Sequence, residues 1–271
     1  MYILTPLPNR NVFNEFCEYE SSLISGYSFV IDIDNFKELN DKYGHNFGDL
    51  VIVELSNFLK LKFKESYIFR ISGDEFYGLL LENIENICNK LDEIKKESPL
   101  FIKYNLSYSV GLHKKELDEN IQISFKYADM ALFKAKKTKG IKVVLADEDF
   151  IREKERELKI LELLEGDLED LYAVYQPKVK ISSSNIIGIE SLVRCYSKEL
   201  VDIYPNELIP IAENFDLIHK IDYKIAEESV KFVKELLTLN MIDDDFRISF
   251  NLSVKTFFFR NKLICFRSNL S

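Results

Sequence analysis

The stretch FRISGDEFYGLLL, residues 69–81, determines how the first half of the chain is expected to fold. Two apolar runs flank the pair Ser72 and Gly73, and this arrangement predicts a β-hairpin with a tight turn. Asp74 and Glu75 follow the turn directly. Two carboxylates held side by side by rigid apolar arms repel each other unless a cation lies near them. The hairpin tip is therefore a candidate metal site; the alternative is an ordinary solvated turn.

A second acidic pair closes the strand FVIDID, residues 29–34. Successive side chains of a strand point to opposite faces, so Asp32 and Asp34 share one face of the predicted sheet. Carboxylate oxygens are the ligands that Mg²⁺ prefers, and protein-bound Mg²⁺ commonly also holds phosphate. A helix is predicted to begin near Asn35, and its free N–H groups would receive phosphate. Asp34 is alternatively only the N-cap of that helix.

Period-2 runs and helical patterns alternate along the first half of the chain. Strands are predicted over residues 27–34, 66–71, 75–81, 101–112 and 141–146, and helices over residues 10–24, 48–63, 83–97 and 123–137. Two helices that cross a sheet containing a hairpin predict an α/β domain, which ends near Leu145. If the hairpin neighbours the first strand, Asp74 completes the metal site that Asp32 begins.

The rest of the chain separates into a charged helix and a second block. Residues 147–171 have one apolar stripe, formed by Leu158, Leu161 and Leu164, and are predicted to form a helical connector. Three plausible strands follow, at residues 171–181, 186–195 and 246–254, with helices between residues 206 and 239. The second block is therefore also a mixture of strands and helices.

Composition and charge limit the classes of function. The formal net charge of −9 argues against a nucleic-acid backbone as a partner. The four cysteines are far apart and form no CxxC pair, which favours reduced thiols in a cytoplasmic protein. No apolar run is long enough to cross a bilayer, and the N-terminal residues lack the pattern of a secretory signal.

Five stretches, in this order, resemble the GGDEF family of diguanylate cyclases: LTPLPNR, FVIDIDNFKELNDKYGHNFGDLVI, FRISGDEF, YSVGL and ADMALFKAKK. The resemblance covers residues 1–146. It implies a ferredoxin-like βαββαβ core and a role in bacterial signal transduction. It also implies the condensation of two GTP molecules into cyclic di-GMP, with one GTP on each subunit of a homodimer.

The resemblance also implies roles for individual residues. Asp32 and Asp74 match the carboxylates that bind Mg²⁺ (or Mn²⁺) together with the carbonyl of Ile33, and Glu75 matches the residue that helps to activate the attacking 3′-hydroxyl. The positions that match guanine-reading residues are Asn40 and Asp49, and those that match phosphate-binding groups are Asn35, Phe36, Lys37 and Lys136. The implied reaction is a metal-assisted in-line displacement at the α-phosphate of GTP, with loss of pyrophosphate.

This chain departs from the family pattern near the nucleotide. Ser72 replaces the first glycine of the motif and adds a side chain where the backbone is expected to turn close to the ligand. Pro6 also replaces a glycine, and Tyr2 stands where an aspartate is usual. These changes weaken the expectation of catalysis, but the candidate carboxylates Asp32, Asp74 and Glu75 are all present.

Two further departures concern phosphate binding and regulation. A phosphate-binding arginine is absent after Lys136, and Lys139 or Lys142 is the candidate to substitute for it. The family's product-inhibition pattern, Arg-x-x-Asp, would fall on Phe63 and Ser66 and is absent. No such feedback is therefore expected.

The second block resembles the start of the EAL family, the phosphodiesterases that linearise cyclic di-GMP, in the stretches YQPKV, IGIESLVR, LIPIAENFDLI and ISFNLS. Glu190 and Asn251 match metal-ligand positions, and Arg194 matches a phosphate contact. The family fold is a TIM-type barrel, which typically takes about 250 residues, whereas residues 172–271 supply 100. We therefore expect an incomplete barrel fragment with a vestigial site and no phosphodiesterase activity.

The C-terminal tail differs in composition from the rest of the chain. The last 26 residues contain five Lys or Arg and no Asp or Glu, and the basic end follows a run of Phe. One hypothesis is that the tail is read in a shifted frame and that the EAL domain is truncated there.

The sequence thus predicts a cyclase-like domain at residues 1–146, a connector at 147–171 and a partial EAL domain at 172–271. Intact Asp32, Asp74 and Glu75 favour a diguanylate cyclase. Ser72 and the missing arginine favour a non-catalytic GTP-binding module that regulates an attached EAL phosphodiesterase. A non-functional fragment is the third alternative.

Overall fold

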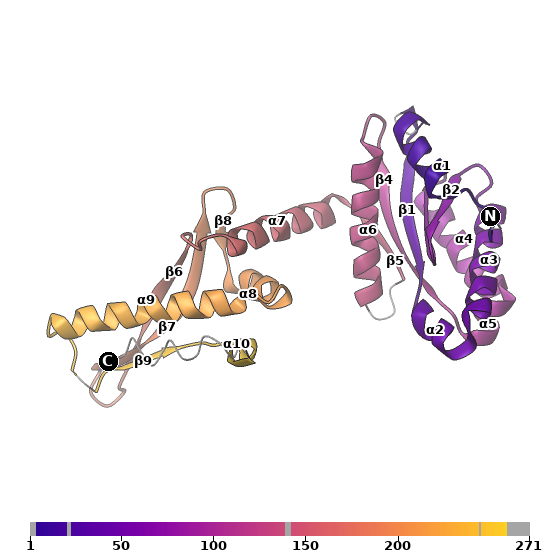
Figure 1. The fold of residues 1–271 in the computed structure, drawn as a ribbon. Helices are drawn as coiled ribbons and strands as arrows, with labels where there is room; N and C mark the ends of the chain where they lie inside the picture. The colour runs from indigo at the N-terminus through magenta and orange to yellow at the C-terminus, as the bar shows by residue number, and fades with distance from the viewer. Residues whose placement is uncertain (1–3, 21–22, 139–141, 244, 259–271) are drawn as a thin grey trace. The chain divides into compact units, whose positions relative to one another are not determined.

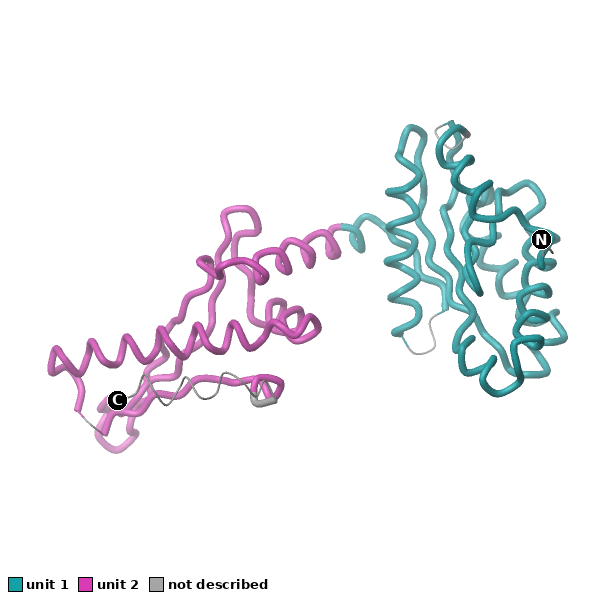
Figure 2. The backbone as a smooth tube through the Cα atoms, in the orientation of Figure 1, with its two compact units in different colours: residues 1–151 teal, residues 152–271 magenta. Residues whose placement is uncertain are grey.

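The computed structural model describes residues 4–20, 23–138, 142–243 and 245–258 (Figure 1). The chain divides into two compact units, Met1–Ile151 and Arg152–Ser271 (Figure 2). Each unit has its own sheet and its own hydrophobic core.

A five-stranded sheet forms the centre of the described part of the first unit, in the order β2-β3-β1-β4-β5. Its strands are β1 (Gly26–Ile33), β2 (Tyr67–Ser72), β3 (Glu75–Leu80), β4 (Tyr108–Lys115) and β5 (Val143–Ala146). β1 is antiparallel to both β3 and β4, and β5 is parallel to β4. The β2–β3 hairpin therefore neighbours β1, as the metal-site prediction requires.

Helices cover both faces of this sheet (Figure 1). One face packs against α1 (Arg10–Glu15), the π-helical segment η1 (Phe16–Glu20) and α6 (Ile121–Lys137), and the other against α2 (Phe36–Tyr43), α3 (His45–Lys62), α4 (Ile84–Glu97) and α5 (Pro99–Tyr104). Ile31 and Ile33 lie in the core beneath α3 and α4, whereas Val30 packs with Phe125 and Leu132 of α6. The alternation along β1 is confirmed, and so is the α/β fold class.

One predicted strand is wrong over its first half. The run expected to begin β4 early instead forms α5, and β4 starts at Tyr108. Ser98 caps α5 with its side chain, Pro99 occupies the first helical position, and Asn105 ends the helix in the left-handed region at φ 51°. These capping signals outweigh the apolar character of the run.

Gly111 allows α6 to lie directly on β4. A Cβ atom at this position would lie 1.9 Å from the Ala128 carbonyl oxygen and 2.3 Å from the Leu132 nitrogen, both in the backbone of α6. The close approach holds α6 against the central strands, and Lys136 in its last turn contacts Asp32 at the end of β1.

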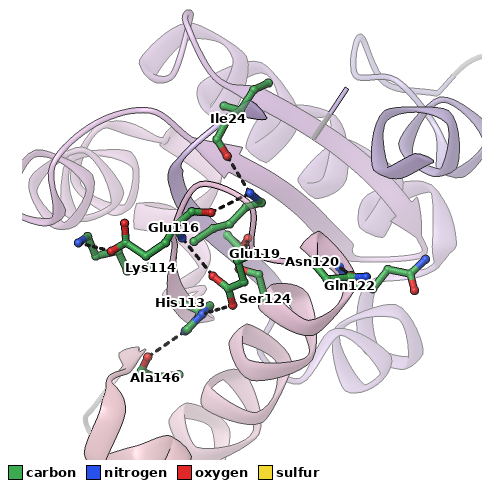
Figure 3. A network of polar contacts seen from close by, with 11 residues as sticks. Ile24, His113, Lys114, Glu116, Glu119, Asn120, Gln122, Ser124 and Ala146 are labelled. Atoms are coloured by element: carbon green, nitrogen blue, oxygen red, sulfur yellow. Dashed lines mark hydrogen bonds and ion pairs between the residues drawn. The ribbon is translucent and has the colours of Figure 1, made fainter. Parts of the chain in front are cut away.

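A polar network fixes the other end of β4 (Figure 3). The His113 ring faces the Ala146 carbonyl oxygen through Nδ1 at 3.1 Å and the Glu119 carboxylate through Nε2 at 2.9 Å. The fully buried Lys115 ammonium donates to the carbonyl oxygens of Ile24 and Glu116. These contacts join β4 to β5, to the following loop and to the segment before β1.

The second unit is built around β7 (Ile186–Ser197), which pairs with every other described strand of its sheet. β6 (Leu171–Val179) and β8 (Val201–Ile203) are antiparallel to β7, and β9 (Arg247–Phe250) is parallel to it. Three plausible strands were predicted, so the count was one too low. β8 has only three residues, which is too short for an alternating sequence pattern to be detected. Its first residue, Val201, has a φ of 60°.

Four described helices complete the second unit: α7 (Glu148–Glu165), whose first residues belong to the first unit, α8 (Pro205–Asn214), α9 (Ile218–Thr238) and α10 (Val254–Phe258). Ile160 and Leu164 of α7 are fully buried in the core of this unit, whereas Leu158 is 37% exposed. Leu161 also packs against this core, so the predicted stripe is confirmed at Leu161 and Leu164 but not at Leu158, whose place Ile160 takes. None of the described helices is both long enough and apolar enough to cross a membrane.

Candidate functional site

The acidic residues predicted for the site lie where β1 and the β2–β3 hairpin meet. Asp32 and Glu75 are directly opposite each other in the antiparallel β1–β3 pair, so their side chains share one face of the sheet. Asp74 lies with Gly73 in the turn just before Glu75. The side chain of Asp32 is 14% exposed. Three carboxylates from two segments far apart in sequence are thus brought together.

Burial and mutual repulsion both disfavour the ionised forms of these groups. Burial, followed by the nearby Asp32 charge, raises the pKa of Asp74 to about 6. Burial also raises the pKa of Asp32, although the Lys136 ammonium opposes the shift. On α6, burial and the Glu75 charge raise the pKa of Asp129. The site is a partly desolvated acidic cluster that a bound cation would stabilise.

Lys136 neutralises part of this cluster. Its Nζ lies 2.7 Å from Asp32 Oδ2, and the contact joins the last turn of α6 to the end of β1. The sequence assigned Lys136 to phosphate, and the ion pair places it directly beside the candidate metal carboxylate. Asp129, on the same helix, was not identified from the sequence, because its proximity to Glu75 depends on how α6 packs.

Asp34 does not cap the helix that follows it. Its carboxylate accepts hydrogen bonds from the Ser107 and Ser109 hydroxyls and pairs with Lys142 at 2.8 Å. Burial disfavours the charge, but these donors outweigh it and lower the pKa of Asp34. Lys142 is one of the two lysines suggested as a substitute for the missing arginine. The other, Lys139, lies outside the described residues.

The N-terminus of α2 directly follows the acidic strand. Asn35 adopts a left-handed conformation at φ 55° and makes no side-chain cap, and α2 begins at Phe36. The first N–H groups of a helix have no acceptor within it, so the amides around Phe36 and Lys37 are available to an anion. The structure therefore places the predicted phosphate-binding segment immediately after Asp32 and Ile33 of β1.

Asn40, predicted to read guanine, packs against the next helix. A Cβ on Gly48 would lie 2.0 Å from Asn40 Oδ1, so glycine is required for this approach. Asn40 Oδ1 is buried and has no hydrogen-bond partner within the described part of the chain. A buried acceptor without a donor costs about 1–3 kcal/mol.

Arg70 is a site residue that the sequence analysis missed. Its Nε donates to the Gly73 carbonyl oxygen at 2.9 Å and holds the hairpin turn. Burial lowers the pKa of Arg70, while the charges of Asp49 and Asp74 oppose the shift. Arg70 thus lies near both a predicted guanine-reading residue and a predicted metal ligand. A lone cation within an apolar strand was the available sequence signal.

Ser72 contacts Glu75 across the turn. The Ser72 hydroxyl donates to Glu75 Oε2 at 2.6 Å, and the two residues are paired in the β2–β3 ladder. The residue that departs from the family motif is therefore bonded to the residue expected to activate the nucleophile.

The donor set suits magnesium but not a closed structural metal site. In the described part of the chain, no group of three or more His, Cys, Asp or Glu side chains is arranged to hold a metal ion. Asp32, Asp74 and the Ile33 carbonyl would leave other positions to water and phosphate, which is how Mg²⁺ is commonly bound.

The second unit brings two of its three predicted residues together. Asn251 Nδ2 lies 3.4 Å from Glu190 Oε1, and Lys178 Nζ lies 3.7 Å from Glu190 Oε2. Arg194, on the same face of β7 as Glu190, donates to the Val193 carbonyl oxygen. An ammonium group therefore already faces the carboxylate that the resemblance assigns to metal.

Comparison with known families identifies both units. The family model described as "Diguanylate cyclase, GGDEF domain" matches residues 3–142, more than half of the chain, and the EAL domain model matches residues 159–265. The chain belongs to the GGDEF family, and an EAL-family domain follows the GGDEF domain.

Two curated relatives match over more than nine-tenths of the chain. The biofilm architecture maintenance protein MbaA of Vibrio cholerae is 29% identical over 275 residues, which cover 92% of this chain and 34% of that protein. The bifunctional diguanylate cyclase/cyclic di-GMP phosphodiesterase MucR of Pseudomonas aeruginosa is 27% identical over 274 residues, which cover 94% and 39%, respectively. The chain thus spans less than two-fifths of the length of these curated relatives.

A solved structure supports the fold. The S helix-GGDEF-EAL structure of Vibrio cholerae LapD, bound to c-di-GMP, matches with a TM-score of 0.51 over 100% of this chain and 66% of that one. The sequence identity is 18%, so this likeness concerns the fold alone.

Proposed function

We propose that residues 1–146 form a diguanylate cyclase domain of a cyclic di-GMP signalling protein, which condenses two GTP molecules into cyclic di-GMP. The observation that carries this proposal is the convergence of Asp32, Asp74 and Glu75 beside the N-terminus of α2. Family membership supports it, because the relative MucR is described as a bifunctional cyclase and phosphodiesterase.

The residues present fit a divalent cation. Asp32 and Asp74 are partly buried, the Asp32 charge raises the pKa of Asp74, and the Glu75 and Asp34 charges raise that of Asp32, so both would gain from a shared positive charge. They would hold Mg²⁺ or Mn²⁺ together with the Ile33 carbonyl. When bound, the cation would neutralise charge on the phosphates and polarise the reacting phosphoryl group.

The protein groups have distinct tasks in the proposed reaction. The amides of Asn35, Phe36 and Lys37 would bind phosphate oxygens at the start of α2. Lys136 would supply a further positive charge. The side chains of Asn40 and Asp49 would form hydrogen bonds with the guanine edge. These contacts orient the α-phosphate for attack.

Glu75 would take the proton from the attacking 3′-hydroxyl. The 3′-oxygen forms a bond to the α-phosphorus of the other GTP, and the bond from that phosphorus to the bridging oxygen of the pyrophosphate breaks. Two such steps make one cyclic dinucleotide and two pyrophosphates. Because each domain offers one GTP site, we propose a homodimer as the catalytic form.

We propose that the second unit does not hydrolyse cyclic di-GMP. Lys178 and Asn251 already contact the Glu190 carboxylate, and the described strands form an open four-stranded sheet. The second candidate function is a non-catalytic GTP-binding module. The Asp32–Lys136 ion pair favours it, because a metal must compete with an internal cation.

Incubation of the full chain with GTP and Mg²⁺ tests the proposal. Pyrophosphate and cyclic di-GMP are expected from the wild-type protein, and Asp74→Ala should lower their rate of formation at least 100-fold, on the order of losing one essential metal ligand. Asp92→Ala removes an exposed acid of α4 and is the matched control. Product formation by Asp74→Ala would overturn the site, and GTP binding without turnover would favour the regulatory module.

A further inference from the structure

Glu75 lies among like charges. The charge of Glu75 raises the pKa values of Asp32, Asp74 and Asp129, so all three carboxyl groups lie within electrostatic range of it. Like charges repel, and a flexible glutamate without a donor would turn away toward solvent. A group that can act as a base must instead remain at a defined position.

Ser72 supplies a donor at that position. A register shift between Arg70 and Ser72 inserts one extra residue into β2, so that Ser72 rather than Ile71 lies opposite Glu75. Such a bulge changes which side chain faces the partner strand. The resulting hydrogen bond, 2.6 Å long from the Ser72 hydroxyl to Glu75 Oε2, has the length of a charge-assisted bond.

We propose that Ser72 is a positioning residue, whose hydroxyl holds the Glu75 carboxylate in the orientation needed to accept the proton of the 3′-hydroxyl. The inference rests on the proposed cyclase function. A glycine at this position has no side-chain donor, so the Ser72 hydroxyl gives this chain a contact that the family motif itself does not provide. The bond leaves Glu75 Oε1 available to the substrate.

Steady-state kinetics of the full chain with GTP and Mg²⁺ separate positioning from folding. Ser72→Ala should lower kcat about tenfold, the loss expected from one charge-assisted hydrogen bond, and leave KM for GTP within about twofold of the wild-type value. Ser72→Thr keeps the hydroxyl and should restore kcat to within about threefold of wild type. Ser66→Ala, at the other end of the hairpin, is the control, because the Ser66 hydroxyl accepts from the Leu81 nitrogen.

A second readout does not depend on turnover. The ¹³C resonance of the Glu75 side-chain carboxyl, assigned by its loss in Glu75→Gln, should move in Ser72→Ala and remain in place in Ser66→Ala. Unchanged kcat in Ser72→Ala, an effect on KM alone, or an unmoved resonance would overturn the role of Ser72. If the wild-type protein forms no product, the cyclase proposal fails, and the resonance still decides whether Ser72 holds Glu75.

Discussion

At the scale of single residues, folding changes the charge state of Asp74 in the mildly acidic pH range. Its pKa is about 6 in the folded protein, against an ordinary value of 3.8. Between these values the folded state binds more protons than the unfolded state, so the contribution of Asp74 to stability declines as pH rises from about 4 to 6. Above pH 6 the ionised group destabilises the metal-free fold.

Asp74→Asn should therefore raise the thermal midpoint of the metal-free protein at pH 7.5 and have little effect at pH 4. Thermal unfolding in the presence of a chelator measures this difference. Asp92→Asn is the control, because pairing with Lys96 lowers the pKa of Asp92 and reverses the expected sign. A lower midpoint for Asp74→Asn at pH 7.5 would contradict the electrostatic account.

A bound divalent metal should turn the destabilising effect of the ionised Asp74 carboxylate on the fold into a stabilising one. A ligand that binds only the folded state stabilises it in proportion to the logarithm of its concentration above Kd. Added Mn²⁺ should raise the midpoint of the wild-type first unit at pH 7.5 and leave Asp74→Asn nearly unchanged. An equal rise in both proteins would place the metal elsewhere.

At the scale of elements, the contact between β4 and α6 depends on Gly111. Gly111→Ala would place a methyl group 1.9 Å from the α6 backbone, which cannot move without displacing the helix. We expect a loss of about 3 kcal/mol in the free energy of unfolding, the upper part of the range for overpacking. Denaturant titration of the full chain measures it.

Gly166→Ala provides the control for that change, because its Cβ would lie 3.4 Å from the nearest atom, at ordinary contact distance. It should change the unfolding free energy by less than about 1 kcal/mol. Equal effects at the two positions would show that loss of glycine, rather than the clash, determines the result.

Local patterns allowed β1, the hairpin and α6 to be predicted, because alternation and turn residues are written in consecutive positions. They also gave the candidate carboxylates, since Asp32 and Asp34 end a strand and Asp74 follows a turn. The capping residues Ser98 and Asn105 were present for α5 but were overlooked beside an apolar run.

The ionic partners could not be obtained in the same way. Lys142 pairs with Asp34 across more than a hundred residues, and Arg70 lies near Asp49 because two elements pack together. No sequence period encodes such contacts. The register shift that turns Ser72 toward Glu75 likewise depends on how the hairpin closes.

At the scale of the whole molecule, the second unit is expected to leave cyclic di-GMP intact. Lys178 faces Glu190 at 3.7 Å, and a buried or paired ammonium group competes with a metal for the same oxygen. Incubation of the full chain with cyclic di-GMP and Mg²⁺ or Mn²⁺ should yield no linear dinucleotide. Hydrolysis that disappears in Glu190→Gln would contradict this prediction.

The ion pairs of the first unit have a consequence for the proposed binding of an anionic nucleotide by an acidic chain. Lys136 and Lys142 are held against Asp32 and Asp34 before any ligand arrives. If a nucleotide enters with its own divalent ion, as proposed, the ion would become the counter-ion of Asp32, and the released Lys136 ammonium would pair with the phosphates. Such an exchange of partners would keep a positive charge beside the half-buried Asp32 carboxylate both before and after binding.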